Sequence, residues 1–244
     1  MNYNDIFNQE TINIFCDGSI TQYKTETIGC PGCVVVKLRE DKSEVIIDTY
    51  LDIIRDCTNN ITENRALLSA IYKAIYYQSL GYKNINIFGD SQLCIKTVTE
   101  WIFSWLQNFY QGHMYNSSGE IVKNEEYVKE LIATIINNNL YVNFYHQKGH
   151  VKNTSDSQKK ALECFKKSNG LKIVDPFLIE RISYYNDYID IITKQYLDSF
   201  IYGCNKYDVE VFKRSDYIIP ATFNIQNIDV DKYKSQIKRR KRYV

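Results

Sequence analysis

Two aspartates follow closely similar apolar stretches, and their placement makes them candidates for metal binding. Residues 12–19 read INIFCDGS and residues 85–91 read INIFGDS, so Asp17 and Asp90 each come after an apolar run and one small residue. If the two runs are neighbouring parallel strands, their ends lie about 4.8 Å apart. Carboxylates that close repel one another, and one is driven towards protonation. A bound divalent cation removes this repulsion, so the pattern favours a metal site.

Two further carboxylates stand near the beginnings of predicted helices. Glu63 opens the helical pattern 63–78 on the same face as Leu67, so it is expected to point at the sheet. Asp156 lies in the first turn of a helix predicted over about 155–167. An alternative for both acids is that they only favour the positive end of the helix. Together the four carboxylates would form an all-oxygen site that suits Mg²⁺ or Mn²⁺ better than zinc.

The hydrophobic periodicity predicts an α/β fold with the element order β-β-β-α-β-α-α-β-α. The first three strands are close in sequence, which favours antiparallel hairpins, whereas a strand–helix–strand connection makes the second strand parallel to the first. We therefore expect a five-stranded mixed sheet, three antiparallel strands followed by two parallel ones, flanked by helices. The predicted strands are 12–16, 34–38, 44–51, 85–89 and 140–145, and the predicted helices are 63–78, 92–106, 125–137 and 155–167.

Four motifs, in this order along the chain, resemble those of the type 1 ribonuclease H family. They are DGS at 17–19, TNNITENRALLSAI at 58–71, GDSQ at 89–92 and KGHVKNTSD at 148–156. Residues 101–128 are also similar to the substrate handle of the bacterial type, including its paired tryptophans. The resemblance covers about residues 10–168 and implies a ribonuclease H-like fold with an unmatched C-terminal appendage.

The resemblance implies an activity and a set of catalytic residues. Asp17, Glu63, Asp90 and Asp156 would hold two Mg²⁺ ions, with Mn²⁺ as a substitute, and His150 would assist proton movement or product release. Two ions about 3.5–4 Å apart would activate water and stabilise the leaving 3′ oxygen. The implied substrate is the RNA strand of an RNA–DNA hybrid, for example a replication primer. Without its place in the GH motif, a single loop histidine such as His150 would be interpreted as a solvated side chain.

The same resemblance implies residues that touch the substrate. Asn59, Asn60 and Gln92 match positions that contact groove edges, and Thr58 matches one that holds a DNA phosphate. Residues 58–60 are equally suited to capping the helix, and the spacing of the tryptophans alone favours a place in the core. The full implied set is Gly18, Ser19, Thr58, Asn59, Asn60, Gln92, Trp101 and Trp105.

Three features depart from the family pattern. Lys123 is the only Lys or Arg among residues 107–124, whereas bacterial handles tend to be rich in both, so phosphate-dependent affinity should be weaker here. The gap from His150 to Asp156 is short, which makes the placement of His150 less certain than that of the carboxylates. The segment after DGS keeps the family's Gly-Pro-Gly character only loosely.

The resemblance divides the chain into a catalytic domain, 1–170, and an extension, 171–244. The extension holds 13 Lys/Arg and 10 Asp/Glu, so it carries +3, while residues 1–170 carry −2. It is read either as a small domain packed on the catalytic unit or as an element for a partner such as a replication protein. Within it, Tyr188, Ile192, Tyr196 and Phe200 form a helical stripe, DVEVF at 208–212 and Pro220 suggest short strands or loops, and KRRKR at 238–242 is a nucleic-acid contact or a solvated tail.

The remaining composition indicates an intracellular, cytoplasmic monomer without a membrane partner. No apolar run approaches the roughly 18 residues that span a bilayer, and the N-terminus does not read as a signal peptide. The seven cysteines are expected to be reduced and packed as small hydrophobes, with zinc or redox use of the CPGC segment, 30–33, as the alternative. The Ile/Asn/Lys/Tyr-rich composition fits an AT-rich genome such as that of a phage or parasite.

Two other functions stay open beside a hybrid-cutting ribonuclease. One is a non-catalytic module of the same fold that binds hybrids or a replication protein, although decayed copies tend to lose carboxylates and all four are present here. The other is a DNA-cutting nuclease of the same wider fold, such as a junction resolvase. The TNN and DSQ matches argue against this second alternative, because they fit readers of the RNA strand.

Overall fold

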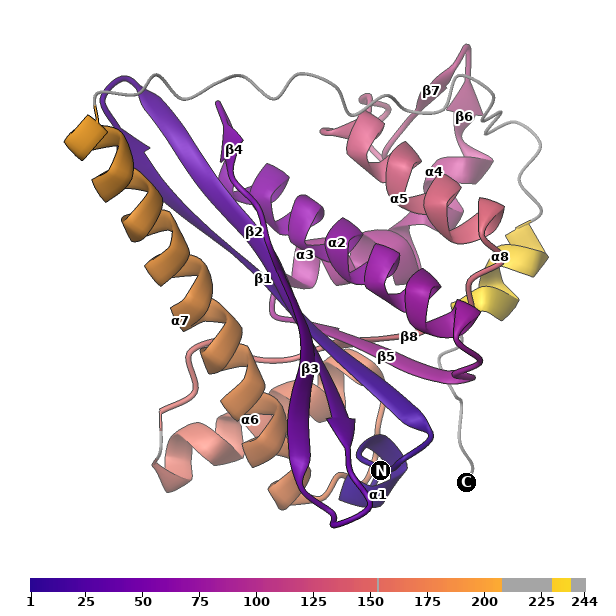
Figure 1. Ribbon diagram of the computed structural model, residues 1–244. Helices are drawn as coiled ribbons and strands as arrows, with labels where there is room; N and C mark the ends of the chain where they lie inside the picture. The colour runs from indigo at the N-terminus through magenta and orange to yellow at the C-terminus, as the bar shows by residue number, and fades with distance from the viewer. Residues whose placement is uncertain (153, 208–229, 238–244) are drawn as a thin grey trace.

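Figure 1 shows a twisted sheet with helices on both of its faces. The structure, a computed structural model, describes residues 1–152, 154–207 and 230–237, so the predictions made for DVEVF, Pro220 and KRRKR lie outside the described residues. The strand order is β3-β2-β1-β5-β8, and the short β4 pairs with β2. The strands of this sheet are β1 (Thr11–Tyr23), β2 (Glu26–Leu38), β3 (Glu44–Leu51), β4 (Ile54–Arg55), β5 (Asn84–Gly89) and β8 (Asn143–His146).

The expected mixed sheet is confirmed: β1, β2 and β3 are antiparallel neighbours, and β5 and β8 run parallel to β1. The first two strands are longer than predicted, because their hairpin stays paired as far as Tyr23 opposite Glu26. Gly18 after the first predicted strand, 12–16, and Gly29, Pro31 and Gly32 before the second, 34–38, predict a connection between them. In the structure Gly18 instead pairs with Pro31 inside the ladder.

The two INIF stretches are neighbouring strands in register. Ile12 pairs with Ile85, Phe15 with Phe88, and Cys16 with Gly89. The Phe15 and Phe88 rings stack with centroids 4.8 Å apart, on the face opposite to that of the isoleucines. The likeness of the two sequences thus comes from two central strands that face the same surroundings.

An asparagine ladder crosses these strands inside the sheet. The amide of Asn86 donates to Asn13 Oδ1 at 2.8 Å, and the amide of Asn143 donates to Asn86 Oδ1 at 3.0 Å. Asn13 in turn donates to the carbonyl of Ile6 at 3.0 Å. Buried amides are costly unless they are hydrogen-bonded, so three strands and the N-terminal helix are joined by one connected set of donors and acceptors.

Each face of the sheet has its own hydrophobic core. Isoleucines of β1 and β5 pack with α2 and α5 on one face, whereas Phe15, Phe88 and Val34 pack with α1, α6 and α7 on the other. The helices are α1 (Tyr3–Ile6), α2 (Asn59–Ser79), α3 (Gln92–Lys96), the π-helical turn η1 (Thr97–Trp101), α4 (Ile102–Gln107), α5 (Glu125–Asn137), α6 (Ser155–Asn169), α7 (Pro176–Tyr207) and α8 (Val230–Gln236).

The helix predicted over 92–106 is present, but a π-helical turn interrupts it. Val98 and Ile102 are fully buried, as the periodicity predicts, whereas the extra residue in this turn leaves Trp101 38 % exposed. The polar segment after α4 forms a small hairpin of β6 (Phe109–Tyr110) and β7 (His113–Met114). Glu125 at the start of α5 anchors this hairpin through His113 Nδ1, at 2.9 Å, and the Met114 amide.

The first helix of the extension, α7, lies along β1 and β2 (Figure 1). Its buried stripe is Leu178, Ile182, Tyr185, Ile189 and Leu197, one residue out of phase with the predicted stripe. Tyr188, Ile192 and Phe200 pack only in part against the cores, and Tyr196 is 44 % exposed. No helix in the described ranges combines the length and apolarity needed to cross a membrane.

The cysteines of the CPGC segment are buried on opposite faces of β2. Cys30 packs near Leu197 in one cluster, and Cys33 packs in the isoleucine core. Burial raises the pKa of each thiol to about 12, so both stay protonated near neutral pH and are poor nucleophiles or metal ligands. Their surroundings match packing as small hydrophobes.

Candidate metal centre

The strand pairing sets Asp17 and Asp90 beside one another. Cys16 pairs with Gly89 in the parallel ladder of β1 and β5, and each carboxylate is the next residue along its strand. Asp90 follows the end of β5, whereas Asp17 lies within β1, because the long hairpin with β2 continues past it. Asp17 is 5 % exposed. The sequence prediction that two carboxylates lie at one edge of the parallel strands therefore agrees with the geometry.

Helix α2 brings the third carboxylate. Thr58 caps the helix, with its hydroxyl accepting a hydrogen bond from the Ile61 amide at 3.3 Å. A Cβ atom at Gly18 would lie 2.8 Å from the Thr62 side chain and 3.2 Å from the Glu63 nitrogen. Glycine in the DGS motif therefore allows the first turn of α2 to approach β1 closely enough for Glu63 to reach Asp17.

The three carboxylates converge, and within the described part of the chain none of them forms an ion pair. Ligand oxygens of Asp17, Glu63 and Asp90 lie within 4.8 Å of one another. Burial, with the charge of Asp17 as the next cause, raises the pKa of Glu63 to about 9. Burial and the charge of Asp90 raise the pKa of Asp17, and burial raises the pKa of Asp90. Buried acids that resist ionisation in this way, with oxygen as the only donor type, fit a hard divalent cation.

The structure places Asp156 outside this cluster. It is exposed in the first turn of α6 and is not one of the three residues that converge. The expectation that it completes the metal site is therefore not met in the geometry, for a physical reason. Residues 155–169 form a helix that packs on α7 and β8 with Ala161 and Phe165 inward, which leaves Asp156 on the outer side.

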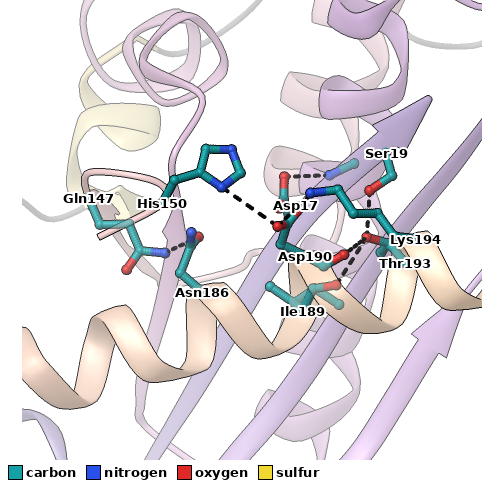
Figure 2. A network of polar contacts seen from close by, with 10 residues as sticks. Asp17, Ser19, Gln147, His150, Asn186, Ile189, Asp190, Thr193 and Lys194 are labelled. Atoms are coloured by element: carbon teal, nitrogen blue, oxygen red, sulfur yellow. Dashed lines mark hydrogen bonds and ion pairs between the residues drawn. The ribbon is translucent and has the colours of Figure 1, made fainter. Parts of the chain in front are cut away.

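Asp190 of α7 occupies the place beside the cluster instead (Figure 2). Its charge contributes to the raised pKa values of both Asp17 and Glu63. One turn further along α7, Lys194 lies 2.7 Å from the Asp190 carboxylate, and its charge lowers the pKa of Asp17. Asp190 is thus a fourth carboxylate at the site, contributed by a helix beyond the segment that carries the sequence resemblance.

The loop after β8 bends over the same group of acids. His150 Nδ1 lies 3.6 Å from Asp190 Oδ2, and the His150 side chain is 73 % exposed. A Cβ atom at Gly149 would lie 2.2 Å from Asp90 Oδ2, so the GH pair requires glycine for close approach. Gln147 Nε2 donates to Asn186 Oδ1 at 2.5 Å, which attaches the start of the loop to α7 (Figure 2).

Sequence reasoning missed the polar residues of α7. Asn186, Asp190 and Thr193 follow one another at helical spacing on the side of α7 that faces β1 and the loop after β8. Asn186 is 1 % exposed and Thr193 is fully buried. The available signal was this polar interruption of an otherwise apolar stripe, because buried polar residues require partners. The predicted apolar stripe that begins at Tyr188 is one residue out of phase with the buried face, so it does not reveal these polar residues.

The residues implied to touch substrate divide into two groups. Thr58, Asn59 and Asn60 are exposed at the start of α2, one turn before Glu63, and Gln92 is exposed two residues after Asp90. Ser19, by contrast, is buried and its hydroxyl pairs with Thr193 Oγ1 at 2.8 Å. Gly18 serves the approach of α2.

The tryptophan pair lies at the surface of the α3–α4 segment. The two rings have centroids 6.0 Å apart. Trp105 packs partly against the core, whereas Trp101 is the more exposed. One ring thus packs against the core, as the spacing alone favours, while the other presents part of its surface to solvent.

Comparisons with solved structures find chains of low sequence identity. The solution structure of the PFV RNase H domain is 16 % identical, with 67 % of this chain and 96 % of that chain covered and a TM-score of 0.47. LC9-RNase H1, described as a type 1 RNase H with the type 2 active-site motif, is 18 % identical, with coverages of 66 % and 74 % and a TM-score of 0.41. The foamy viral protease-reverse transcriptase in complex with an RNA/DNA hybrid is 15 % identical, with coverages of 62 % and 18 % and a TM-score of 0.45.

Sequence comparison is more specific. Ribonuclease H of Neorickettsia sennetsu (strain ATCC VR-367 / Miyayama) is 37 % identical over 65 residues, which are 27 % of this chain and 40 % of that relative. The aligned part therefore spans less than half of the relative's length. A model of the RNase H family matches residues 9–161. Because that match covers more than half of the chain and includes all three clustered carboxylates, the chain belongs to the RNase H family and its fold is RNase H-like.

Proposed function

We propose that this protein is a divalent-metal-dependent endonuclease that hydrolyses the RNA strand of RNA–DNA hybrids. The observation that carries the proposal is the convergence of Asp17, Glu63 and Asp90 within 4.8 Å at the end of two parallel strands. Membership of the RNase H family supports the same reaction. Removal of a replication primer or another hybrid is the role that fits this activity.

The four ligands of the proposed centre are Asp17, Glu63, Asp90 and Asp190. The role that the sequence resemblance gives to Asp156 passes to Asp190, because Asp190 influences the pKa values of Asp17 and Glu63 and lies next to His150. The catalytic unit then extends through α7 rather than ending near residue 170. A replication partner that binds the extension is retained as part of the proposal.

Mg²⁺ is the proposed cation, with Mn²⁺ as a substitute, because both favour carboxylate oxygen. Bound as a pair, such ions polarise the scissile phosphate, activate water and stabilise the leaving oxygen. The protein's own residues hold the carboxylates at one edge of the sheet, and the loop of His150 lies above them. His150 is placed to move a proton at Nδ1 or to assist product release, since it is exposed and adjacent to Asp190.

Specificity for RNA requires groups that reach the minor groove and the 2′-hydroxyls. Asn59, Asn60 and Gln92 are exposed amides that flank Glu63 and Asp90. Each amide both donates and accepts hydrogen bonds, so these side chains are suited to groove edges next to the scissile phosphate. Trp101 offers an exposed aromatic face for the DNA strand.

The test presents a hybrid, double-stranded RNA and double-stranded DNA to the full chain, with and without Mg²⁺. We expect cleavage of the hybrid's RNA strand only, and only with metal, and we expect Asp17→Asn to abolish it. Equal cutting by Asp17→Asn would refute the metal centre. Cutting of DNA duplexes or junctions instead of hybrids would establish a DNA nuclease, and binding without any cutting would establish a non-catalytic module.

A further inference from the structure

The segment that contains His150 and precedes helix α7 is unusually basic. Residues 148–172 contain seven lysines and two acidic residues, and hence carry +5, whereas the whole chain carries +1. The segment consists of the loop after β8, helix α6 and the turn into α7. Residues 148–172 are therefore strongly basic, whereas the remainder of the chain has a net negative charge.

Helix α6 presents its lysines away from the protein. Ala161 and Phe165 are buried against α7 and β8. Lys159, Lys160 and Lys167 are exposed and lie within an arc of about 100° on the opposite side, since an α-helix has 3.6 residues per turn. We call these three lysines, with the exposed loop residues Lys148, Lys152 and Lys172, the lysine face.

The lysine face has no acidic partner within the described part of the chain. Lys166 and Glu163 pair with each other at 2.8 Å, and no ion pair joins any of the six members of the face to a described residue. Like charges gathered on one exposed surface repel one another and create a positive potential that attracts polyanions. The face is therefore complementary to a regularly spaced row of negative charges.

The loop members of the lysine face adjoin the carboxylate cluster. Lys148 precedes Gly149, where an added Cβ atom would lie 2.2 Å from Asp90 Oδ2, and Lys152 follows His150 by two residues. A nucleic-acid strand with one phosphate at the cluster therefore has neighbouring phosphates within reach of this loop. The opposite side offers little charge, since residues 107–124 hold a single Lys123 and Lys129 of α5 is paired with Glu126 at 3.1 Å.

We propose that the lysine face binds the phosphate backbone of the hybrid outside the cleavage site, and so replaces the charge missing from the handle. This inference rests on the proposed function. Contacts of lysine with phosphate are independent of base sequence and release counterions. The face would then determine hybrid affinity and its dependence on salt, while the carboxylates carry out hydrolysis.

The test measures hybrid binding in EDTA, where no cleavage occurs, as a function of salt concentration. The triple variant Lys159→Gln, Lys160→Gln, Lys167→Gln removes three charges from the exposed side of α6. Each lost phosphate contact reduces the magnitude of the negative slope of log K against log salt by about 0.9, so the magnitude should decrease by about 2–3. The Kd for hybrid at about 0.1 M salt should rise at least about tenfold. Turnover at saturating hybrid with Mg²⁺ should stay within about twofold of wild type.

A matched control removes three charges from the other end of the strands. Arg39, Lys42 and Lys83 lie in the turns next to the pairs Leu38–Glu44 and Thr11–Asn84, at the strand ends away from Asp17 and Asp90. Changing all three to Gln should leave the slope unchanged. Equal slopes for the α6 variant and wild type would overturn the inference while leaving the proposed function intact.

Other outcomes are equally decisive. Failure of the wild-type chain to bind or cut any hybrid would overturn the proposed function and this inference together. Binding of the wild type, but not of the α6 triple variant, to phosphatidylserine-containing vesicles, with the hybrid slope unaltered, would assign the lysine face to an anionic membrane. Circular dichroism of the variant checks that α6 remains folded, as expected for exposed positions.

Discussion

His150 Nδ1 lies 3.6 Å from the carboxylate of Asp190, although 40 residues of sequence separate them. The pair joins the exposed loop to α7. Replacing His150 with Asn removes the titratable ring nitrogen and keeps a side chain of similar polarity. We expect kcat to fall by about 10²-fold, within the range for a group that transfers protons, while hybrid affinity changes little.

Single-turnover kinetics distinguish the two roles open to His150. A proton-transfer role lowers the single-turnover rate, whereas a role in product release lowers only the steady-state rate. A variant that keeps wild-type rates in both measurements would show that His150 is merely a solvated loop residue.

The pair Asp190→Asn and Asp156→Asn tests which acid belongs to the centre. Both are conservative changes in helices, and they differ in whether the residue adjoins the cluster. We expect Asp190→Asn to reduce kcat by at least about 10²-fold and to weaken Mg²⁺ binding, since a negative ligand is lost. Asp156→Asn should stay within about twofold of wild type, and the opposite ranking would restore Asp156 to the site.

The metal-free protein should lose stability as pH rises. Burial and Asp17 raise the pKa of Glu63 from 4.5 to about 9, so the folded state binds a proton across this interval that the unfolded state releases. Stability is therefore greatest below about 4.5 and falls as pH approaches 9. The loss from Glu63 exceeds about 1 kcal/mol, the free energy of one pKa unit.

Thermal unfolding in EDTA at pH 5 and pH 8 measures this effect. Glu63→Gln should be less pH-dependent than wild type and more stable at pH 8. Mg²⁺ affinity of the wild type should increase over the same interval, since the ligands must be deprotonated. A wild type whose unfolding temperature in EDTA rises from pH 5 to pH 8 would contradict the predicted direction.

Gly149→Ala should disturb the centre without touching its ligands. The new Cβ atom would stand 2.2 Å from Asp90 Oδ2, so either the loop or the carboxylate must move. We expect Mg²⁺ affinity and kcat each to fall by about tenfold or more, as displacements of about 1 Å are costly in catalysis. Gly203→Ala in α7 meets no atom within 4 Å and is the matched control.

Tyr233 of α8 is expected to support the tryptophan segment. It is fully buried, its hydroxyl donates to the Val98 carbonyl in the π-helical turn at 2.9 Å, and its ring packs 5.9 Å from Phe103. Tyr233→Phe removes this hydrogen bond, at a cost of about 0.5–1.5 kcal/mol. The exposed Tyr202→Phe should leave stability unchanged.

Intrinsic fluorescence reports this change directly, because the two tryptophans of the chain are both in this segment. The emission of the Tyr233→Phe variant should shift, and its KM for hybrid should rise more than its kcat falls. Unchanged emission together with a lower unfolding temperature would limit Tyr233 to a structural role.

Much of the fold and the convergence of Asp17, Glu63 and Asp90 could be predicted from the sequence, because local patterns carried the information. Thr58 caps α2, α5 spans the predicted 125–137, and the INIF runs are parallel neighbours as their likeness suggested. The position of Asp17 and Asp90 follows from strand pairing alone. Glu63 follows from the phase of α2 relative to the sheet.

The approach of Asp190 to the cluster could not be predicted in the same way, because it depends on tertiary packing. Asp156 and Asp190 both lie on helices after β8, and the sequence spacing favoured the nearer one. The structure inserts α6 between the histidine loop and the helix that lies along β1. An inserted helix changes which acid lies near the sheet without altering the local motif, so the motif alone does not indicate the approach of Asp190.

The asparagine ladder of β1, β5 and β8 has a consequence for how the metal centre is assembled during folding. Apolar side chains tolerate a strand sliding by two residues, since Ile and Phe would still fall on their own faces. A slide of that size would place Asn13 opposite Phe88 in one direction, or Asn86 opposite Phe15 in the other, and would break the hydrogen bond between the two amides. A buried amide left unpaired in this way costs several kcal/mol. The ladder therefore favours one register of β1 and β5: misaligned pairings of the two similar strands are less stable, even before any ligand is bound. Asp17 and Asp90 are brought level by amides four residues earlier in each strand.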